Sequence, residues 1–572
     1  MTTAVALAAL AAALLALGLS PDRVLELAGD AGMAREEGLR HGALLARATA
    51  AARAVALGGT AFALARARTP VSPPPRAPAG PDAWAAVAAL VLLALALRLV
   101  RLDQGLWYDE IVTWVEYVRL PFGALVTTYT AQNNHLLYSL SARLAFLGLG
   151  EGAFALRLPA ALFGAAGVAA LFVFARRVVA TREALLASLL LAVSYHHVWF
   201  SQNARGYTGL LVATTLGTAL FLDGMRRPAR ARWLAYAACL ALALYVHLSA
   251  VFAFAVHGLA WLALLAVDRR GGRPPRWPGA RSPWPLAGFG LGGLLALQLY
   301  AVLIPQIVEA FVRQAGTEAV VKVETWTSPL WTALEVVRGL ARLGPLTLGV
   351  AGVAGAVGAF GTWRLARRDP LAVGVMLVPA PLTLAALLAI HFHVWPRYFF
   401  ALLGFFLVLG VHGVFEAARA VARRAGRPHR LAERVATAAL LLAALGSAFT
   451  VRTAWLHPKQ DFVGARDFVE AQRAPDDVVV TAGLATYPYD RLYAPAWGSV
   501  EDAAELEAVA AAPGRTWLVM TFPAYMAEAH PKLLERARTR FARVRPCGGT
   551  VGGGEIQVWR SREAPRAPEG AS

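Results

Sequence analysis

The sequence predicts an all-α polytopic membrane protein with a small α/β domain at its C-terminal end, and three observations predict this class. Of its 572 residues, 58% are hydrophobic and 16% are charged, whereas soluble proteins average about 25% charged residues. Apolar runs of about 20 residues, long enough to cross a hydrocarbon core of about 30 Å, recur as far as residue 450. Beyond residue 450 the composition becomes that of an ordinary soluble domain.

The distribution of positive charge gives the predicted orientation. Lys and Arg number 55 against 36 Asp and Glu, an excess that in a soluble protein would suggest nucleic-acid binding. Here the basic residues concentrate in short connectors between apolar runs. These connectors are 176–182, 226–232, 269–281, 364–368 and 423–434. They occupy every second gap, as the positive-inside rule requires of cytoplasmic loops, so membrane orientation explains the charge and no nucleic-acid partner is expected.

This alternation orients eleven predicted spans. The spans are 83–100, 158–175, 183–200, 207–223, 233–247, 250–267, 285–304, 346–363, 371–390, 398–416 and 435–451. Two further apolar stretches precede them, at 3–19 and 43–65. The second is weaker because it carries Arg47 and Arg53 inside the apolar run. We therefore expect between eleven and thirteen transmembrane helices.

Three domains follow from this pattern. Residues 1–82 form an N-terminal extension that ends in a Pro-rich linker, and residues 83–451 form the transmembrane core. The tail at 452–572 has roughly 120 residues, enough to bury its own core. Its expected helices are 461–472 and 530–544, and its expected strands are 476–483, 515–522 and 555–561. We expect this domain to cap the outer face of the bundle.

The loop at 101–157 is the most informative segment expected on the extracytoplasmic side. Its stretches EIVTWVEYV and LLYSLSARLAFLGL have apolar residues at helical spacing with Trp and Tyr interspersed, which favours helices in the membrane interface. If the second stretch crossed the membrane, the basic connector 176–182 would lie outside the cytoplasm and every later connector would change sides, so we do not expect a span there. The loop opens with GLWYDEIVTW, which brings the carboxylates of Asp109 and Glu110 next to the membrane.

Several polar residues at the outer ends of the spans are candidates for chemistry. Asp109 and Glu110 could cap a helix or serve as acid–base groups. Because adjacent side chains diverge, the two are unlike the carboxylate pair of a glycosidase. Arg157, Arg205 and Arg397 lie on the outer side against the charge trend, where they could hold a phosphate or extend to lipid headgroups.

Metal binding stays open on this sequence. Six histidines are expected on the outer side: His135, His196, His197, His247, His391 and His393. None of them completes a ligand set, and His135 is favoured for a functional role because it follows the acidic pair in the same loop. The two cysteines, Cys239 in a span and Cys547 in the tail, form no metal or disulfide pattern. No cofactor is required, although Mg or Mn could bind weakly.

An ordered set of motifs gives the chain a family resemblance. LWYDE is followed by NNHLLYSLSARLAFLGLG, then ALRLPAALFGAAGVAALFVFARRV, then SYHHVWFSQNARGYTGLL. Over roughly residues 83–420 this order is similar to the bacterial GT-C glycosyltransferases of the dolichyl-phosphate-mannose protein mannosyltransferase-like and RgtA/B/C/D-like families, which are glycosyltransferase family 39-like. The resemblance implies a GT-C fold and a multi-pass location in the bacterial inner membrane, with the catalytic loop and the C-terminal domain extracytoplasmic.

The resemblance also implies a reaction and a site. A sugar would pass from a polyprenyl-phosphate-linked donor to an acceptor that is a lipid, a cell-envelope glycan or a protein. Asp109 matches the catalytic position. Its neighbour Glu110 and His135 are counted with it as catalytic candidates. The residues assigned to the donor phosphate or lipid are Arg157, Gln202, Arg205, Arg397 and Tyr398. The residues assigned to the sugar or acceptor are Trp107, Tyr108 and Asn134, for which an aromatic belt at the headgroups is an equal alternative for the two rings.

Two other functions remain open at this point. A transporter or flippase of lipid-linked saccharides would carry ionisable residues near the middle of its spans and would commonly show repeated halves. A non-catalytic scaffold would keep its activity without Asp109. The clear charges lie mainly at span ends and no repeat is visible, so the transferase is the favoured hypothesis. Relatives commonly have His-Pro or Asp-Pro where this chain has NNHLL, which leaves the acceptor open.

Overall fold

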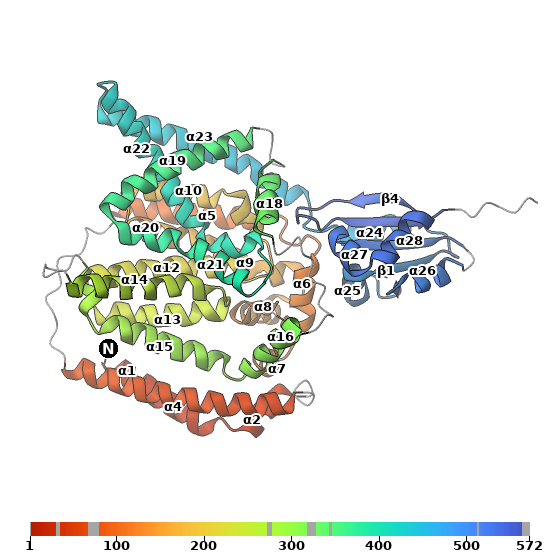
Figure 1. Ribbon diagram of the computed structural model, residues 1–572, viewed down its shortest axis with the longest axis horizontal. Coiled ribbons are helices and arrows are strands. Elements are labelled where there is room, and N and C mark those ends of the chain that lie inside the picture. Colours follow the sequence, from red (N-terminus) through yellow and green to blue (C-terminus); the bar gives the residue numbers. More distant parts are fainter. Residues whose placement is uncertain are drawn as a thin grey trace, which may run out of the picture.

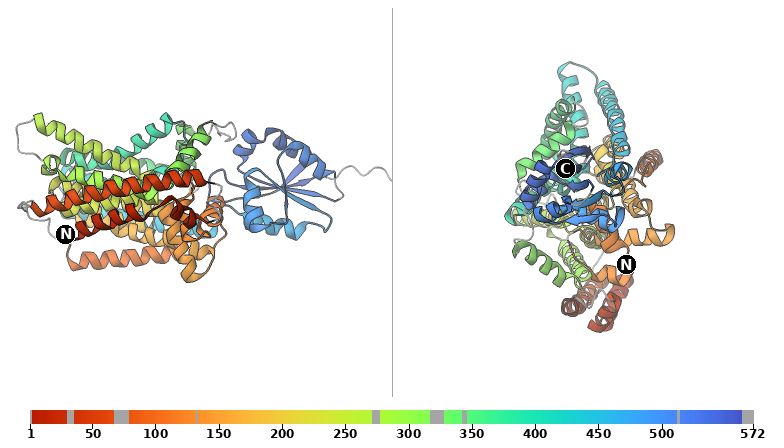
Figure 2. Two further views of the ribbon diagram at one scale, coloured as in Figure 1. Left: turned by 90° about the horizontal axis from the view of Figure 1, so that it is seen from below. Right: turned by 90° about the vertical axis from the view of Figure 1, so that its right-hand side faces the viewer.

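The computed structural model describes residues 2–29, 35–66, 79–131, 133–270, 277–316, 328–341, 346–511 and 514–562. A helical bundle forms most of the molecule, and a domain built around a β-sheet projects from one end of it (Figures 1 and 2). Most of the predicted Pro-rich linker, and residues 271–276 of the basic connector 269–281, lie outside the described residues.

Eight helices of the described chain are long and apolar enough to cross a membrane, or up to eleven if each of three bent helix pairs is one span. The eight are α5 (Pro81–Leu99), α9 (Ala153–Ala175), α12 (Tyr207–Arg226), α14 (Ala250–Arg270, apolar to Val267), α19 (Thr347–Arg368), α20–α21 (Pro370–Leu377 and Pro379–Ala389), η3–α22 (Pro396–Leu402 and Leu403–Arg424) and α23 (His429–Leu456). The predicted multi-pass membrane protein is confirmed.

The three bent pairs are α1–α2 (Thr2–Gly18 and Pro21–Ala28), α10–α11 (Thr181–Ala192 and Tyr195–Ser201) and α15–α16 (Trp284–Tyr300 and Ile304–Gly316). The α10–α11 break falls inside the predicted span 183–200, whereas the other two breaks fall at the ends of the predicted stretches 3–19 and 285–304. At the α10–α11 break, the Ser194 hydroxyl accepts a hydrogen bond from the His197 amide and starts the second helix. Arg98 donates to the Ala192 carbonyl at 3.1 Å, which satisfies the end of the first.

Two helices fall short of the span criteria. α13 (Arg230–Val246) coincides with a predicted span but has 17 residues. α4 (Glu36–Arg66) contains the predicted stretch 43–65, and it packs along α1 and α15 at the edge of the bundle (Figure 1). The N-terminal extension therefore adds a helical hairpin to the core.

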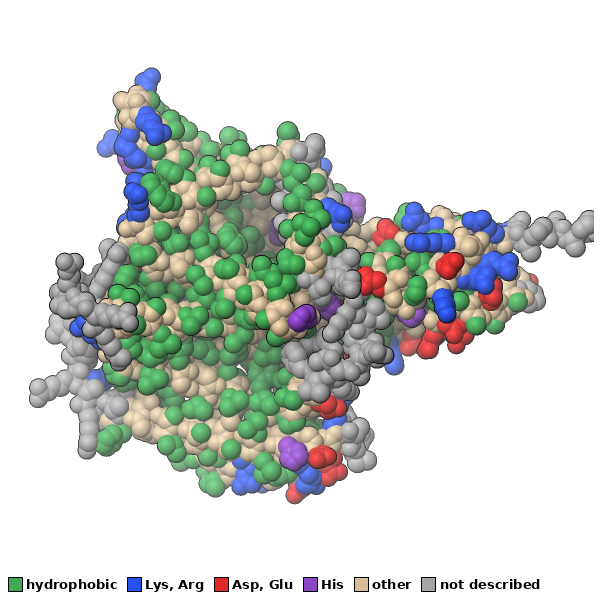
Figure 3. Space-filling model, in the orientation of Figure 1, with side chains coloured by type: hydrophobic (Ala, Val, Ile, Leu, Met, Phe, Trp, Pro, Cys, Tyr) green, Lys and Arg blue, Asp and Glu red, His purple; other side chains and the backbone are tan. Residues whose placement is uncertain are grey.

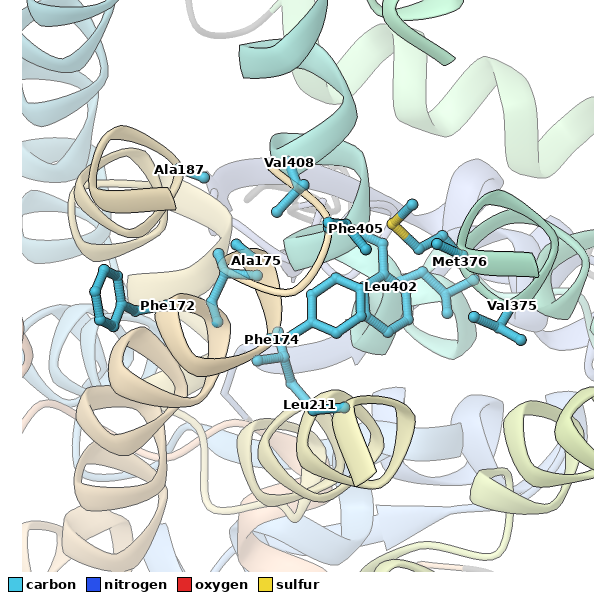
Figure 4. Close-up of a cluster of buried hydrophobic side chains, with 14 of the residues drawn as sticks. Phe172, Phe174, Ala175, Ala187, Leu211, Val375, Met376, Leu402, Phe405 and Val408 are labelled. Atoms are coloured by element: carbon cyan, nitrogen blue, oxygen red, sulfur yellow. The ribbon is translucent and has the colours of Figure 1, made fainter. Parts of the chain in front are cut away.

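The bundle is held together by close-packed apolar side chains. Phe174 of α9 and Phe405 of α22 have ring centroids 4.8 Å apart, and Leu211 and Met376 lie in the same cluster (Figure 4). Glycines let backbones approach directly, since a Cβ on Gly361 of α19 would lie 2.5 Å from the Gly413 Cα of α22.

Four basic connectors meet at one end of the bundle. Arg177 pairs with Asp223 at 2.7 Å, and Arg226 next to it pairs with Asp369. Arg182 of the first connector reaches Glu433 of the last at 3.3 Å. Figure 3 shows blue side chains at the α22–α23 turn, far from the sheet domain. The sheet domain is thus at the opposite end of the bundle.

The C-terminal domain contains a five-stranded mixed sheet in the order β2-β1-β3-β5-β4. The strands are β1 (Val478–Ala482), β2 (Gly498–Val500), β3 (Thr516–Thr521), β4 (Phe541–Cys547) and β5 (Ile556–Ser561). β1 pairs in parallel with β2 and β3, whereas β5 pairs antiparallel with β3 and β4. The predicted α/β domain is confirmed. Its predicted helix at 530–544 ends earlier, as α28 (Pro531–Arg540), because the residues that follow form β4.

Helices cover both faces of this sheet. α26 (Ala503–Ala510), α27 (Pro523–Ala529) and α28 share one apolar cluster with Leu518 and Met520 of β3. On the other face, α24 (Phe462–Gln472) packs with Trp517 and Val519 in a cluster that continues into Leu106 and Ile111 of the outer loop. The sheet domain and the loop that carries Asp109 therefore share a hydrophobic core.

The outer loop itself folds into short helices. These are α6 (Tyr108–Thr113), the π-helical turn η1 (Trp114–Val118), α7 (Phe122–Thr127) and α8 (Leu136–Leu149). α8 has 14 residues and is too short for a span, as predicted for the second amphipathic stretch. α7 packs directly on α2, where a Cβ on Gly123 would meet the Leu27 carbonyl oxygen at 2.2 Å.

Candidate active site

A cavity of about 320 Å³ lies at the end of the bundle that carries the sheet domain. Its polar lining residues are Asp109, Asn133, Asn134, His135, Arg205, His247, Ser249, His393, Arg397 and Tyr398. Its apolar lining residues include Leu248, Val251, Phe252, Leu387, Ile390, Phe392 and Trp395. Segments from four distant parts of the chain thus form one site that combines polar and apolar side chains.

Asp109 occupies the first turn of α6, where free backbone amides favour a carboxylate. Its Oδ2 lies 3.1 Å from Arg397 Nη1 and 3.9 Å from Arg205 Nη1. The side chain keeps 17% exposure, and Oδ1 accepts no hydrogen bond from the described residues. Its carbonyl oxygen accepts bonds from Thr113 at 2.8 Å and from Asn133 Nδ2 at 3.0 Å. The carboxylate is therefore oriented yet accessible.

The two arginines give the cavity a positive balance. Arg205 follows α11 and donates through Nη1 to the Asn133 carbonyl at 3.1 Å. Arg397 lies in η3, with its guanidinium 4.9 Å from the centre of the Trp395 ring. The Nε atom of each is buried without a hydrogen-bond partner among the described residues. A buried donor without an acceptor is costly, so this arrangement suits an anionic ligand.

Two histidines line the same cavity and stay neutral. His135 Nδ1 accepts the Gly206 amide at 2.8 Å, which leaves the ring proton on Nε2, 3.3 Å from Arg205 Nη2. Burial, reinforced by the nearby Arg205 charge, holds the pKa of His135 well below its usual range. Burial also lowers the pKa of His247 to about 3. Both rings therefore present N–H donors or apolar edges rather than charge.

Glu110 points away from the cavity into a buried ion cluster. Its carboxylate accepts from Arg157 at 2.7 and 2.5 Å and from the Ala204 amide at 2.8 Å, and Lys459 Nζ lies 4.0 Å away. Burial alone would raise the pKa of Glu110, but the charges of Arg157 and Lys459 and these hydrogen bonds bring it below the usual range. Glu110 is thus an ionised carboxylate that ties α6 to α9.

Arg157 completes this cluster and does not line the cavity. It also donates to the carbonyl oxygens of Leu102, Gln104 and Gly105, at 2.7 to 3.0 Å. These bonds fix the chain just before α6. Arg157 and Glu110, which were grouped with the donor-binding and catalytic residues on sequence grounds, instead hold the loop that presents Asp109.

The remaining predicted site residues divide between the cavity and its surroundings. Asn134 and Tyr398 line the cavity, and the Asn134 side chain is held by Thr128 and Ser139. Gln202 lies outside the cavity wall and donates to the carbonyl oxygens of Arg98 and Val100.

The two predicted aromatic contacts also lie outside the cavity wall. Trp107 donates to Asn203 Oδ1 at 3.0 Å, and its ring centroid is 6.3 Å from that of Trp199. Tyr108 faces Tyr487 of the sheet domain, with ring centroids 6.1 Å apart. Both rings therefore contact protein at the junction between the bundle and the sheet domain.

Sequence reasoning missed several residues around the site. Asn133 orients both Asp109 and Arg205, and its position beside the polar-His step NNH was the only signal. Lys459 and Gln460 approach the site from the sheet domain, and no motif marks them. Within the described ranges, no group of three or more His, Cys, Asp or Glu could hold a metal ion.

The comparisons with known proteins bear on the bundle. Residues 135–276 match the family model of the dolichyl-phosphate-mannose-protein mannosyltransferases. This match covers part of the helical bundle, about a quarter of the chain. The matched segment begins at His135 and contains Arg157, Gln202 and Arg205, whereas Asp109 and Arg397 lie outside it. No curated protein matches the chain.

Solved structures of membrane transferases resemble this chain at low identity. ArnT from Cupriavidus metallidurans, bound to undecaprenyl phosphate, is 17% identical, with a TM-score of 0.46 over 84% of this chain and 98% of that one. The Archaeoglobus fulgidus oligosaccharyltransferase AglB, bound to an inhibitory peptide and a dolichol-phosphate, is 12% identical, with a TM-score of 0.47 over 81% and 73%. Arabinosyltransferase EmbB from Mycobacterium smegmatis is 15% identical, with a TM-score of 0.39 over 65% and 34%.

Proposed function

We propose that this protein is a GT-C membrane glycosyltransferase that moves a sugar from a polyprenyl-phosphate-linked donor to an acceptor hydroxyl, with Asp109 as the general base. The observation that carries the proposal is the position of Asp109 beside Arg205 and Arg397 in a cavity that is also lined by apolar side chains. One carboxylate faces two guanidinium groups, which leaves a net positive charge for an anionic lipid headgroup.

The donor phosphate would bind at the arginines. Guanidinium groups recognise phosphate oxygens through charge-assisted hydrogen bonds. The buried Nε atoms of Arg205 and Arg397, together with His135 Nε2, supply donors that face no protein acceptor among the described residues. The prenyl chain would lie against the apolar lining residues of the cavity, such as Phe252, Ile390 and Phe392, which offer a hydrocarbon surface.

The chemistry needs one base. The acceptor hydroxyl gives its proton to Asp109 while its oxygen bonds to the anomeric carbon, and the bond from that carbon to the phosphate oxygen breaks. Polyprenyl phosphate leaves as an anion that Arg205 and Arg397 stabilise. Among the described residues of the cavity wall, Asp109 is the only carboxylate, so a single displacement at the anomeric carbon is the mechanism favoured here.

The proposal includes a side of the membrane. Because four basic connectors share the end opposite the sheet domain, the positive-inside rule favours a cytoplasmic location for that end. The cavity and residues 452–572 would then lie outside the cytoplasm, with 83–451 as the catalytic core. The description of the matched family names mannose as the sugar. The proposal leaves the acceptor open between a lipid, a glycan and a protein.

Mass spectrometry of lipids and glycans tests this proposal in cells. Cells that produce the wild-type chain are compared with cells that produce Asp109→Asn at the same membrane level. Asp103→Asn is the matched control, because Asp103 is an exposed carboxylate of the same loop. We expect the Asp109 variant alone to lose a glycosylated product and to accumulate donor. Unchanged products in the Asp109 variant would overturn the proposal.

A further inference from the structure

The sheet domain reaches the site through two consecutive side chains. Lys459 and Gln460 follow α23 at the entrance to the domain, and both are buried, with exposed fractions of 8% and 1%. Lysine is rare in this chain, where only Lys322, Lys459 and Lys532 accompany the arginines.

Gln460 holds the start of α6. Its Oε1 accepts a hydrogen bond from the Tyr108 amide at 3.0 Å, one residue before Asp109. Its Nε2 donates to Thr521 Oγ1 and to the Gly554 carbonyl, so the glutamine is fixed by the sheet. Tyr493 supports the same side, since its hydroxyl accepts from the Leu106 amide at 2.6 Å and donates to the Leu106 carbonyl at 3.1 Å.

Lys459 holds the segment that leads to Arg205. Its ammonium donates to the Gln202 carbonyl oxygen and lies 5.5 Å from the centre of the Trp199 ring. Thr550 of the sheet domain accepts from Trp199 Nε1 at 2.7 Å, and its own amide bonds to the Pro458 carbonyl at 3.0 Å. The Lys459 carbonyl accepts the Val551 amide at 3.0 Å, which secures the lysine backbone.

We infer that Lys459 and Gln460 are positioning residues through which the sheet domain sets the two halves of the active site. Gln460 acts on the base and Lys459 acts chiefly on the phosphate ligand, with a weaker contact to Glu110 at 4.0 Å. Gln460, with Tyr493, places the base through Tyr108 and Leu106. Lys459, with Thr550, places the phosphate ligand Arg205 through Gln202 and Trp199. This inference rests on the proposed function, because it assigns the two halves to the base and to the donor phosphate.

The arrangement predicts that the two halves fail differently. A misplaced base slows the chemical step but leaves the donor bound, whereas a misplaced Arg205 weakens donor binding. A purely structural role would instead lower the amount of folded protein and leave both constants of the folded fraction unchanged. The separation between turnover and donor affinity therefore distinguishes positioning from stability.

The test compares full-length variants in detergent or nanodiscs. Gln460→Met and Tyr493→Phe remove the contacts on the Asp109 side, and Lys459→Met and Thr550→Val remove those on the Arg205 side. Gln557→Met is the control, because Gln557 is a buried glutamine that bonds to Glu555 within the sheet domain. Donor affinity is measured by titration with undecaprenyl phosphate, which needs no sugar transfer. Turnover is measured with lipid-linked donor extracted from the producing cells.

We expect the Asp109-side variants to lose about tenfold or more in kcat with undecaprenyl phosphate affinity within about twofold of wild type. We expect the Arg205-side variants to lose about tenfold in affinity. The inference would be overturned if kcat and affinity changed equally in the variants of both sides, or if neither constant changed in the folded protein. The milder Tyr493→Phe and Thr550→Val keep each arm testable where a neighbouring variant fails to fold. A fully active Asp109→Asn would instead overturn the proposed function.

Discussion

Asp109 Oδ2 and Arg397 Nη1 lie 3.1 Å apart although 288 residues separate them in the chain. One belongs to the first turn of α6 and the other to the 3₁₀ turn that begins the η3–α22 span. The contact joins the outer loop to the far half of the bundle. It also brings the proposed base into contact with a guanidinium that we assign to the donor phosphate.

Removal of Arg397 or Arg205 should weaken donor binding. Arg397→Met and Arg205→Met each lose a charge-assisted contact of about 1.5–3 kcal/mol, which corresponds to about 10- to 100-fold in undecaprenyl phosphate affinity. Arg473→Met is the control, because Arg473 pairs only with Glu470 on the surface of the sheet domain. Binding measured by titration at constant salt checks the prediction. Wild-type affinity in both variants would show that the phosphate binds elsewhere.

Replacement of Glu110 should act on stability before chemistry. Glu110→Gln leaves Arg157 and Lys459 buried with an uncompensated charge, at a cost of about 3–5 kcal/mol. The thermal midpoint should fall by several degrees, as followed by fluorescence in detergent. Glu470→Gln, at the exposed pair with Arg473, should leave the midpoint unchanged. A Glu110→Gln protein of normal stability that cannot transfer sugar would make Glu110 part of the chemistry.

The pH dependence of stability should report Lys459. Burial lowers the pKa of Lys459 to about 7, against the opposing charge of Glu110. An unfolded lysine titrates near pH 10.4, so between about pH 7 and pH 10 the unfolded chain binds one more proton than the folded chain. Stability therefore rises with pH across this window. The thermal midpoint of the wild type minus that of Lys459→Met should therefore become more positive from pH 7 to about pH 10.

A control on the other side of the domain isolates this effect. Lys532 is exposed on α28, and Lys532→Met should show a pH-independent difference from wild type. A flat difference for Lys459→Met as well would mean that Lys459 stays charged in the folded protein throughout.

His135 should contribute a donor and not a titrating group. Because burial and Arg205 hold its pKa well below the usual range, the ring is neutral at physiological pH. His135→Gln should weaken undecaprenyl phosphate binding while leaving the midpoint of the acid limb of the pH–rate profile unchanged. Turnover at a series of pH values measures this midpoint. A shift of the acid limb in the variant would assign that limb to His135.

Much of the architecture follows from the sequence because its signals are local. Apolar runs of span length and basic connectors depend on composition alone, and they predicted the bundle and its alternation. The bends at Ser194 and near Tyr300 were missed, because an apolar run of span length does not fix where a helix breaks. The strand β4 was read as helix because RARTRFARV fits both periodicities, and only its pairing with β5 decides between them.

The site divides in the same way. Asp109, Asn134, His135, Arg205, Arg397 and Tyr398 were all candidates from motif order or span position, and they line one cavity. Glu110 could not be separated from Asp109 by sequence, because the direction of each side chain at the start of α6 depends on Arg157 and on the Ala204 amide. Lys459 and Gln460 act through distant tertiary contacts, which leave no pattern in the chain.

Single-turnover transfer by the purified full chain tests the central claim most directly. The protein is saturated with lipid-linked donor extracted from the producing cells, and transfer is compared between wild type, Asp109→Asn and Asp103→Asn. A lost general base predicts a fall of about 10²- to 10⁴-fold in the Asp109 variant, with undecaprenyl phosphate binding preserved and the Asp103 variant at wild-type rate. A transfer rate for Asp109→Asn within about tenfold of wild type would contradict the assignment of Asp109 as the base.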